Sequence, residues 1–147
     1  MTHLEKYQKV ATIVSAIVGA AALLFAAITY QKNSELQREA ITIQIFRDYS
    51  MTRLEYPEFA LGYQVDLDSV PSTQKEKYFD FADYSLYTGE TILTMNEGDS
   101  AWIGTVRGII ETHSNYILSD EFPEANYSEQ MKSLIKKTLP EFHYNPH

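Results

Sequence analysis

The hydrophobic residues of this chain are concentrated in one stretch near the N-terminus. From Val10 to Tyr30, 21 successive residues include no charge and no proline, and the nearest charged residues are Lys9 and Lys32. Because a helix rises about 1.5 Å per residue, this stretch would extend roughly 31 Å, which matches the hydrocarbon core of a bilayer. The pattern predicts a single transmembrane helix over residues 10–30.

The residues around the stretch favour an uncleaved anchor. Tyr7 and Tyr30 stand where interfacial aromatic residues are common, and Lys6, Lys9 and Lys32 lie beside them. The alternative is a cleaved signal peptide, but its apolar core is typically only about 7–15 residues long. Basic residues flank both ends of the stretch in similar number, so the positive-inside rule does not fix the orientation of the helix in the membrane.

Beyond the anchor, the helical spacing of apolar residues predicts further helices and no strand. The predicted ranges are residues 34–56, 72–95, 99–117 and 126–139. The last helix is expected to begin at Asn126, whose side chain can cap it while Glu129 completes a capping box. The chain is therefore predicted to be all-α, with a transmembrane helix followed by a small domain of about four helices.

This pattern divides the chain into four parts. They are an N-terminal flank (1–9), the transmembrane helix (10–30), a membrane-proximal helix (31–56) and an acidic helical domain (57–147). The apolar positions at helical spacing in the membrane-proximal helix are Leu36, Ala40, Ile43, Phe46 and Tyr49.

The net charge of −8 is unevenly distributed. Residues 57–100 hold nine acidic and two basic groups, whereas residues 31–56 hold four of each. The plainest interpretation of the acidic block is a solvated helix face. Because duplex binding depends on Lys and Arg at the phosphates, the surplus of acid argues against general nucleic-acid binding.

Side chains that carry chemistry form no recognisable catalytic or metal site. The absence of cysteine excludes disulfides, a thiolate nucleophile and cysteine-ligated zinc. The histidines show no metal-ligand spacing, and a satisfied or exposed side chain is expected at the central one; they are His3, His113, His143 and His147. The pairs Asp66/Asp68 and Asp80/Asp83 lack the glycine and closing glutamate of a calcium loop. We expect no enzymatic activity, metal or cofactor.

Small or weakly polar residues recur on one line of the predicted transmembrane helix, here called the seam. Alternate steps of three and four residues pass through Thr12, Ser15, Gly19, Ala22, Ala26 and Thr29. In lipid, small residues permit close helix packing and hydroxyl hydrogen bonds, and a period of about 3.5 residues keeps one line facing a partner. The seam predicts a homo-oligomer with these residues at the contact or lining a pore. The competing explanation is composition, because 11 of the 21 residues are Ala, Gly, Ser or Thr.

The same steps continue towards the C-terminus through Asn33, Leu36, Ala40, Ile43, Arg47, Ser50 and Leu54. If the helix is unbroken at the junction, Arg47 lies near the axis of a parallel oligomer, where facing guanidinium groups are costly unless an anion or carboxylates neutralise them. Arg47 is therefore a candidate anion- or ligand-binding residue. In the alternative, Ser34 caps a new helix with Gln37, and Arg47 pairs with Glu39, Asp48 or an acidic helix.

The N-terminal anchor, the junction TYQKNSELQREA and the segment RLEYPEFA resemble small bacterial membrane-anchored helical proteins of uncharacterised function, over about the first 60 residues. The architecture also resembles transmembrane effectors of anti-phage systems, such as the channel-forming effector of the Hailong system. That resemblance implies an inner-membrane protein with a cytoplasmic C-terminal domain and a nucleotide-type ligand. The net charge of −8 counts against an oligonucleotide unless basic groups converge inside an assembly.

Two functions remain open from the sequence. The first is an oligomeric pore or channel effector whose helical domain gates or assembles a transmembrane bundle. The second is a membrane-anchored, non-enzymatic interaction module that displays its acidic domain to a protein partner.

Overall fold

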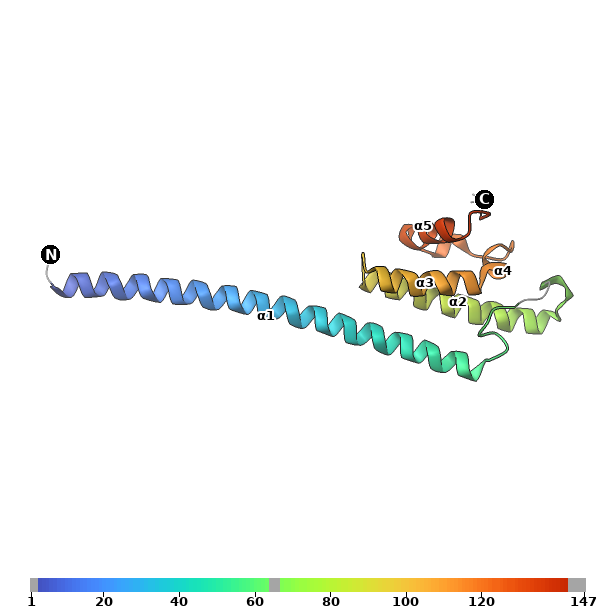
Figure 1. Cartoon of the computed structure of the whole chain (residues 1–147), viewed down its shortest axis with the longest axis horizontal. Helices are drawn as coiled ribbons and strands as arrows, with labels where there is room; N and C mark the ends of the chain where they lie inside the picture. Colours follow the sequence, from blue (N-terminus) through green and yellow to red (C-terminus); the bar gives the residue numbers. More distant parts are fainter. Residues whose placement is uncertain (1–2, 64–66, 143–147) are drawn as a thin grey trace. The chain divides into compact units, whose positions relative to one another are not determined.

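The computed structural model describes the backbone of residues 3–63 and 67–142 (Figure 1). Every regular element in these ranges is helical, and no strand occurs in them. The elements are α1 (His3–Glu55), a 3₁₀ turn (Leu67–Ser69), α2 (Ser72–Met95), α3 (Ser100–Thr112), α4 (Ser114–Ile117), a second 3₁₀ turn (Glu124–Asn126) and α5 (Glu129–Thr138). The prediction of an all-α fold is confirmed.

The chain divides into two compact units, Met1–Glu39 and Ala40–His147, and the division falls within α1. The alternative in which Ser34 caps a new helix is wrong, because α1 continues through this position. Asn33 and Ser34 each cost a helix no more than about 0.7 kcal/mol relative to alanine, and good helix formers flank them. Without proline or glycine, this junction has too weak a stop signal to end the helix.

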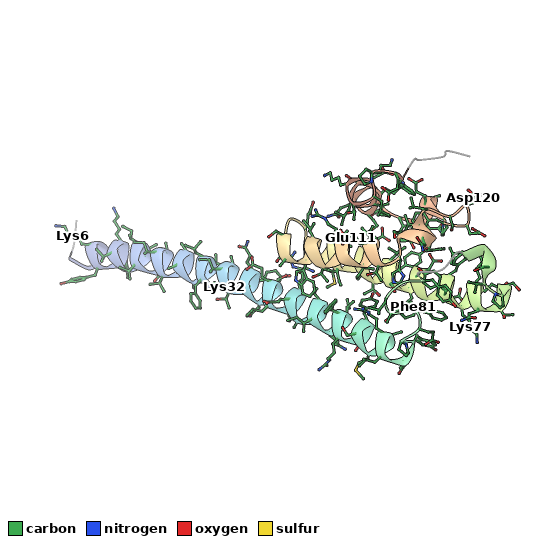
Figure 2. The ribbon with its side chains drawn as sticks, turned by 45° about the vertical axis from the view of Figure 1, so that its right-hand side comes forward. Lys6, Lys32, Lys77, Phe81, Glu111 and Asp120 are labelled. Atoms are coloured by element: carbon green, nitrogen blue, oxygen red, sulfur yellow. The ribbon has the colours of Figure 1, made fainter. Side chains whose placement is uncertain are left out.

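The first unit presents its apolar stretch without cover from the rest of the chain. Side chains from Lys6 to Asn33 are all exposed, and by length and composition this part of α1 could span a membrane. Lys6 and Lys32 stand on either side of the stretch (Figure 2). Surface of this kind is stable in lipid or against other protein, so the composition agrees with the predicted anchor.

In the second unit, α2 packs along α3, and α5 contacts both (Figure 1). Helical spacing along residues 72–95 predicts one apolar face on α2, formed by Tyr78, Phe79, Ala82, Leu86 and Leu93. All of these are buried in the core except Phe79, which is half-buried. Phe81 also lies among the packed side chains, whereas Lys77, Glu111 and Asp120 lie at the periphery (Figure 2). The helices approach closely at Gly89, where a Cβ atom would lie 3.0 Å from Cγ1 of Val106.

Two predicted helix boundaries are wrong. The helix expected over 99–117 stops at Thr112, because the backbone of the buried His113 leaves the helical region before α4 begins. The last helix is capped by Ser128, whose Oγ accepts a hydrogen bond from the backbone N–H of Met131, and not by Asn126. The extended, buried Tyr127 separates Asn126 from the helix.

The apolar line predicted for the membrane-proximal helix is only partly buried. Tyr49 is buried and Phe46 is half-buried, as expected, but Leu36, Ala40 and Ile43 are exposed. The side of α1 that faces the core instead includes Thr42, whose Oγ1 accepts a hydrogen bond of 2.8 Å from Nδ2 of Asn96. The side of α1 that contacts the core therefore includes the polar Thr42 and differs from the apolar line predicted for this helix.

The segment after α1 is fastened at several points. Nη2 of Arg53 donates to the carbonyl oxygen of Ala60 at 2.8 Å, and Nδ2 of Asn115 donates to that of Tyr63 at 2.7 Å. Gly62 has a φ of +75° and lies directly against the carbonyl of Thr112. These contacts connect the end of α1 to the corner between α3 and α4.

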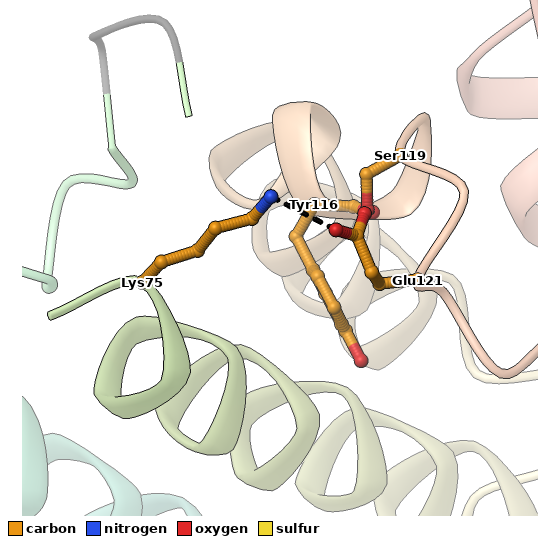
Figure 3. Close-up of polar contacts among 4 residues, drawn as sticks. All are labelled: Lys75, Tyr116, Ser119 and Glu121. Carbon is orange, nitrogen blue, oxygen red and sulfur yellow. Dashed lines mark hydrogen bonds and ion pairs between the residues drawn. The ribbon is translucent and has the colours of Figure 1, made fainter. Parts of the chain in front are cut away.

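A salt bridge connects the start of α2 to the link that follows α4. Nζ of Lys75 lies 2.8 Å from Oε1 of Glu121, and this hydrogen bond lowers the pKa of the Glu121 carboxyl (Figure 3). In the same link, Oγ of Ser119 donates to the carbonyl oxygen of Tyr116 at 2.7 Å (Figure 3). Because the salt bridge is exposed, its contribution to stability is small, about 0–1 kcal/mol.

We expect Gly62→Ala to destabilise the second unit strongly. The new Cβ would lie 1.9 Å from the carbonyl oxygen of Thr112, and the φ of +75° is strained for any residue with a Cβ. The loss of unfolding free energy should be about 2–4 kcal/mol. Urea unfolding of the full-length protein in detergent, followed by near-ultraviolet circular dichroism, measures it; an unchanged midpoint would contradict the tight contact.

We expect Gly108→Ala, in contrast, to stabilise the protein. Gly108 lies within α3 and is exposed, with no atom within 4 Å of the position that a Cβ would occupy. Replacing an unneeded helical glycine with alanine should add about 1 kcal/mol to the unfolding free energy in the same assay. A loss of stability would show that this face of α3 has a close neighbour.

Candidate functional site

The seam residues lie on the surface of the first unit. Thr12, Ser15, Gly19, Ala22, Ala26 and Thr29 are all exposed. The hydroxyl of Thr12 donates to the backbone carbonyl of Gln8 at 2.9 Å, so this polar group is satisfied within its own helix. The seam thus has the exposure that a contact with another copy requires, and that contact stays a prediction.

Gly19 is the clearest case of a seam residue that the fold of the chain does not explain. Apart from its chain neighbours and the adjacent helix backbone, no described atom lies within 4 Å of the position of a Cβ on Gly19. Glycine in a helix interior costs about 1 kcal/mol relative to alanine, and nothing in the described chain offsets this cost. A small residue at this position is useful where another helix approaches in lipid.

Arg47 is exposed on the part of α1 that belongs to the second unit. The alternative in which it pairs with Glu39, Asp48 or an acidic helix is not found, since Arg47 has no hydrogen bond or ion pair within residues 3–63 and 67–142. Its guanidinium is therefore available to an anion or to another chain.

A cluster of aromatic rings surrounds the end of α1 and contains a cation that sequence analysis missed. The guanidinium of Arg53 lies 5.8 Å from the ring centroid of Tyr49, a distance compatible with a cation–π contact. Phe59 extends the cluster, and its ring centroid lies 5.8 Å from that of Tyr78 and 5.9 Å from that of Phe81. The spacing of four residues between Tyr49 and Arg53 was the available signal, because it places both on one face of a helix.

His113 is fully buried beside this cluster, so the expectation of an exposed histidine is wrong, and that of a satisfied one holds for a single ring nitrogen. Its Nδ1 lies 3.3 Å from the hydroxyl of Tyr78, whereas Nε2 has no hydrogen-bond partner among the described residues. Burial, and secondly the charge of Arg53, lower the pKa of His113 to about 4.

Asp83 connects two tyrosines in the second unit. The hydroxyls of Tyr116 and Tyr127 donate to the same carboxylate oxygen, at 2.7 Å and 3.0 Å. Burial, together with the hydrogen bond and negative charge of Asp83, raises the pKa of both tyrosines. Tyrosines held protonated in this way serve as hydrogen-bond donors that connect helices, and neither is suited to act as a base.

The other candidate residues form no metal site within the described part of the chain. The described residues contain no group of three or more His, Asp or Glu side chains that could hold a metal ion. In the pair Asp80/Asp83, Asp83 accepts the hydrogen bonds from both tyrosine hydroxyls. In the pair Asp66/Asp68, Asp66 and the side chain of Asp68 lie outside the described residues. His143, His147 and the side chain of His3 also lie outside it.

Comparison of the chain with protein-family models, with curated proteins and with solved structures finds no match.

We expect the buried His113 to make the folded protein sensitive to acid. Histidine in the unfolded chain takes a proton near pH 6.5, whereas folded His113 takes one only near pH 4. Its contribution to stability is therefore complete above the unfolded pKa and is lost progressively as the pH falls towards the folded one. The unfolding free energy should fall by about 2 kcal/mol between about pH 7 and pH 5.

The measurement is urea unfolding of the full-length protein in detergent at a series of pH values. The control, His113→Gln, cannot titrate and should be nearly flat over the same interval, although it is less stable at neutral pH. An equally steep loss in this variant would assign the acid sensitivity to other groups.

Proposed function

We propose that this protein is a single-span membrane protein that assembles through its seam into a transmembrane bundle of the pore or channel type. Its membrane helix packs against copies of itself along Thr12, Ser15, Gly19, Ala22, Ala26 and Thr29. The helical domain, which continues from the same α1, gates or assembles this bundle. No catalytic step is part of the proposal.

The observation that carries this proposal is the surface around Gly19. The fold leaves the glycine without a neighbour, and every seam residue beside it is exposed. Small residues at this spacing allow helix backbones to approach closely in lipid, where the hydrophobic effect does not favour one helix contact over another.

The cellular setting of the proposal rests on the resemblance to anti-phage effectors. In that setting the protein lies in a bacterial inner membrane, with its C-terminal domain in the cytoplasm, and opens when an infection signal arrives. An anionic, nucleotide-type ligand at Arg47 is the proposed signal, supported by the exposure of this arginine and its lack of a partner among the described residues. A reporter fused after His147 tests the orientation.

A second candidate is the anchored interaction module, and the surface of α2 favours it. Residues 40–147 hold 17 acidic and eight basic groups, a net charge of −9. On α2, the exposed Tyr84 and Tyr87 lie near Asp80 and are held in place by ring contacts with Tyr49 and Tyr127. Ordered tyrosines are common at protein contacts because they lose little entropy on binding.

Gly19→Leu distinguishes the two functions. Bulk in the seam should separate the backbones and lower self-association in detergent or bilayers by at least about tenfold, whereas a tether would be unaffected. The matched control is Ala20→Leu, which adds bulk about 100° around the same helix from Gly19, away from the seam. Sedimentation or light scattering measures the mass of the full-length protein, and equal association by both variants would contradict a contact at the seam.

The absence of cysteine allows a second test by disulfide cross-linking. Ala22→Cys places a thiol in the seam, and Ala20→Cys places one about 200° around the helix. We expect oxidation in membranes to yield dimers from Ala22→Cys and few from Ala20→Cys. A strictly monomeric protein in both assays would remove the pore proposal and leave the interaction module.

A further inference from the structure

The second unit covers only one side of the part of α1 that it includes. Thr42 and Tyr49 are buried, and Arg53 is hydrogen-bonded to Ala60. These three residues recur at helical spacing, so they define a single buried side. The opposite side of this part of α1 faces no other described element.

That opposite side, here called the outer face, consists of Ala40, Ile43, Arg47 and Leu54. Ser50, the other position of the same line, is half-buried, and its hydroxyl donates to the carbonyl oxygen of Phe46. Ile43 is 53% exposed and Leu54 is 74% exposed, and Met51 beside them is 56% exposed. These residues lie beyond the apolar stretch, where water replaces lipid. A row of large apolar side chains left in water along one helix indicates a surface that another protein covers.

The spacing along α1 points to a second copy as that protein. The outer face stands at the same alternating steps of three and four residues as the seam, and α1 is one helix from His3 to Glu55. Parallel copies that meet through such a spacing present the same positions to one another. A single geometry therefore accounts for both rows, and this step rests on the proposed function.

Arg47 is the one charged residue in this spacing from Thr12 to Leu54. Within a parallel contact, each added copy brings another guanidinium towards the first. Repulsion between like charges at such a contact weakens association about tenfold for every ~1.4 kcal/mol. The described part of the chain offers Arg47 no carboxylate partner that would cancel this repulsion.

We propose that the outer face of α1 packs against the outer face of a second copy, and that Arg47 limits the strength of this contact. The membrane seam holds the copies together, while the repulsion between Arg47 side chains keeps their α1 helices loosely packed outside the membrane. Neutralising the charge tightens the packing. Arg47 thus acts as an electrostatic restraint on assembly, through the contact itself and not through the fold of its own domain.

The experiment is disulfide cross-linking of the full-length protein in bilayers, with Ala40→Cys on the outer face. Ile41→Cys is the matched control, since it is also exposed but lies about 100° further around the helix. Both are oxidised at low ionic strength and at about 1 M NaCl, where the Debye length is only about 3 Å. Each is also combined with Arg47→Gln.

We expect Ala40→Cys to form dimers slowly at low salt and about tenfold faster with Arg47→Gln or at high salt. Ile41→Cys should stay slow in all conditions. Equal rates for the two cysteines would show that the outer face does not meet itself. A slower reaction with Arg47→Gln would show that Arg47 attracts a neighbour's acid, and would overturn the restraint.

Ala22→Cys separates failure of this inference from failure of the proposed function. If Ala22→Cys forms dimers and Ala40→Cys does not, the copies meet only in the membrane, and the outer-face contact is wrong while the proposed function stands. If neither forms dimers, the seam itself is wrong. Arg47 and Ala40 are exposed, so we expect their substitution to leave the fold intact. Unchanged helix content in every variant would exclude misfolding.

Discussion

The surface that α1 leaves exposed in the second unit depends on the contact between one side of this helix and the helices of the core. Tyr49 is buried there, Phe46 lies edge-on to Trp102, and Asn96 donates to the buried hydroxyl of Thr42. Aromatic rings supply most of the buried apolar area in such a contact, and the hydrogen bond fixes the rotation of the helix about its axis. Because this side of α1 packs against the core, the rotation of the helix about its axis determines which of its residues stay exposed.

The exposed surfaces of α1 differ in chemistry between the two units. In the first unit the free surface is the whole apolar stretch with its seam, and in the second it is the outer face around Arg47. Neither has the features of a catalytic or metal site, whereas both have those of a surface that binds other helices. The proposed assembly uses each surface in its own solvent: small residues in lipid, and apolar residues with one restraining charge in water.

The buried polar groups near the end of α1 serve stability more than chemistry. His113 stays neutral because burial disfavours its charged form, and Arg53 beside it adds to the effect. The nitrogen Nε2 of His113 and Nε of Arg53 are buried without a partner in the described chain, which makes this corner costly to hold together. The fastened segment around Gly62 compensates by closing tightly against α3.

The sequence by itself determined the long apolar stretch, the all-helical fold, the extent of α2 and most of its buried face, because hydrophobic spacing and length carry this information locally. It also located the seam and Arg47, because residues at helical spacing can be identified from their positions in the chain alone. Only the tertiary structure decided that α1 continues past Ser34, that Thr42 turns towards the core in place of Ile43, and that His113 ends α3. These outcomes depend on partners distant in the chain, such as Asn96 for Thr42 and Tyr78 for His113, and local spacing carries no record of them.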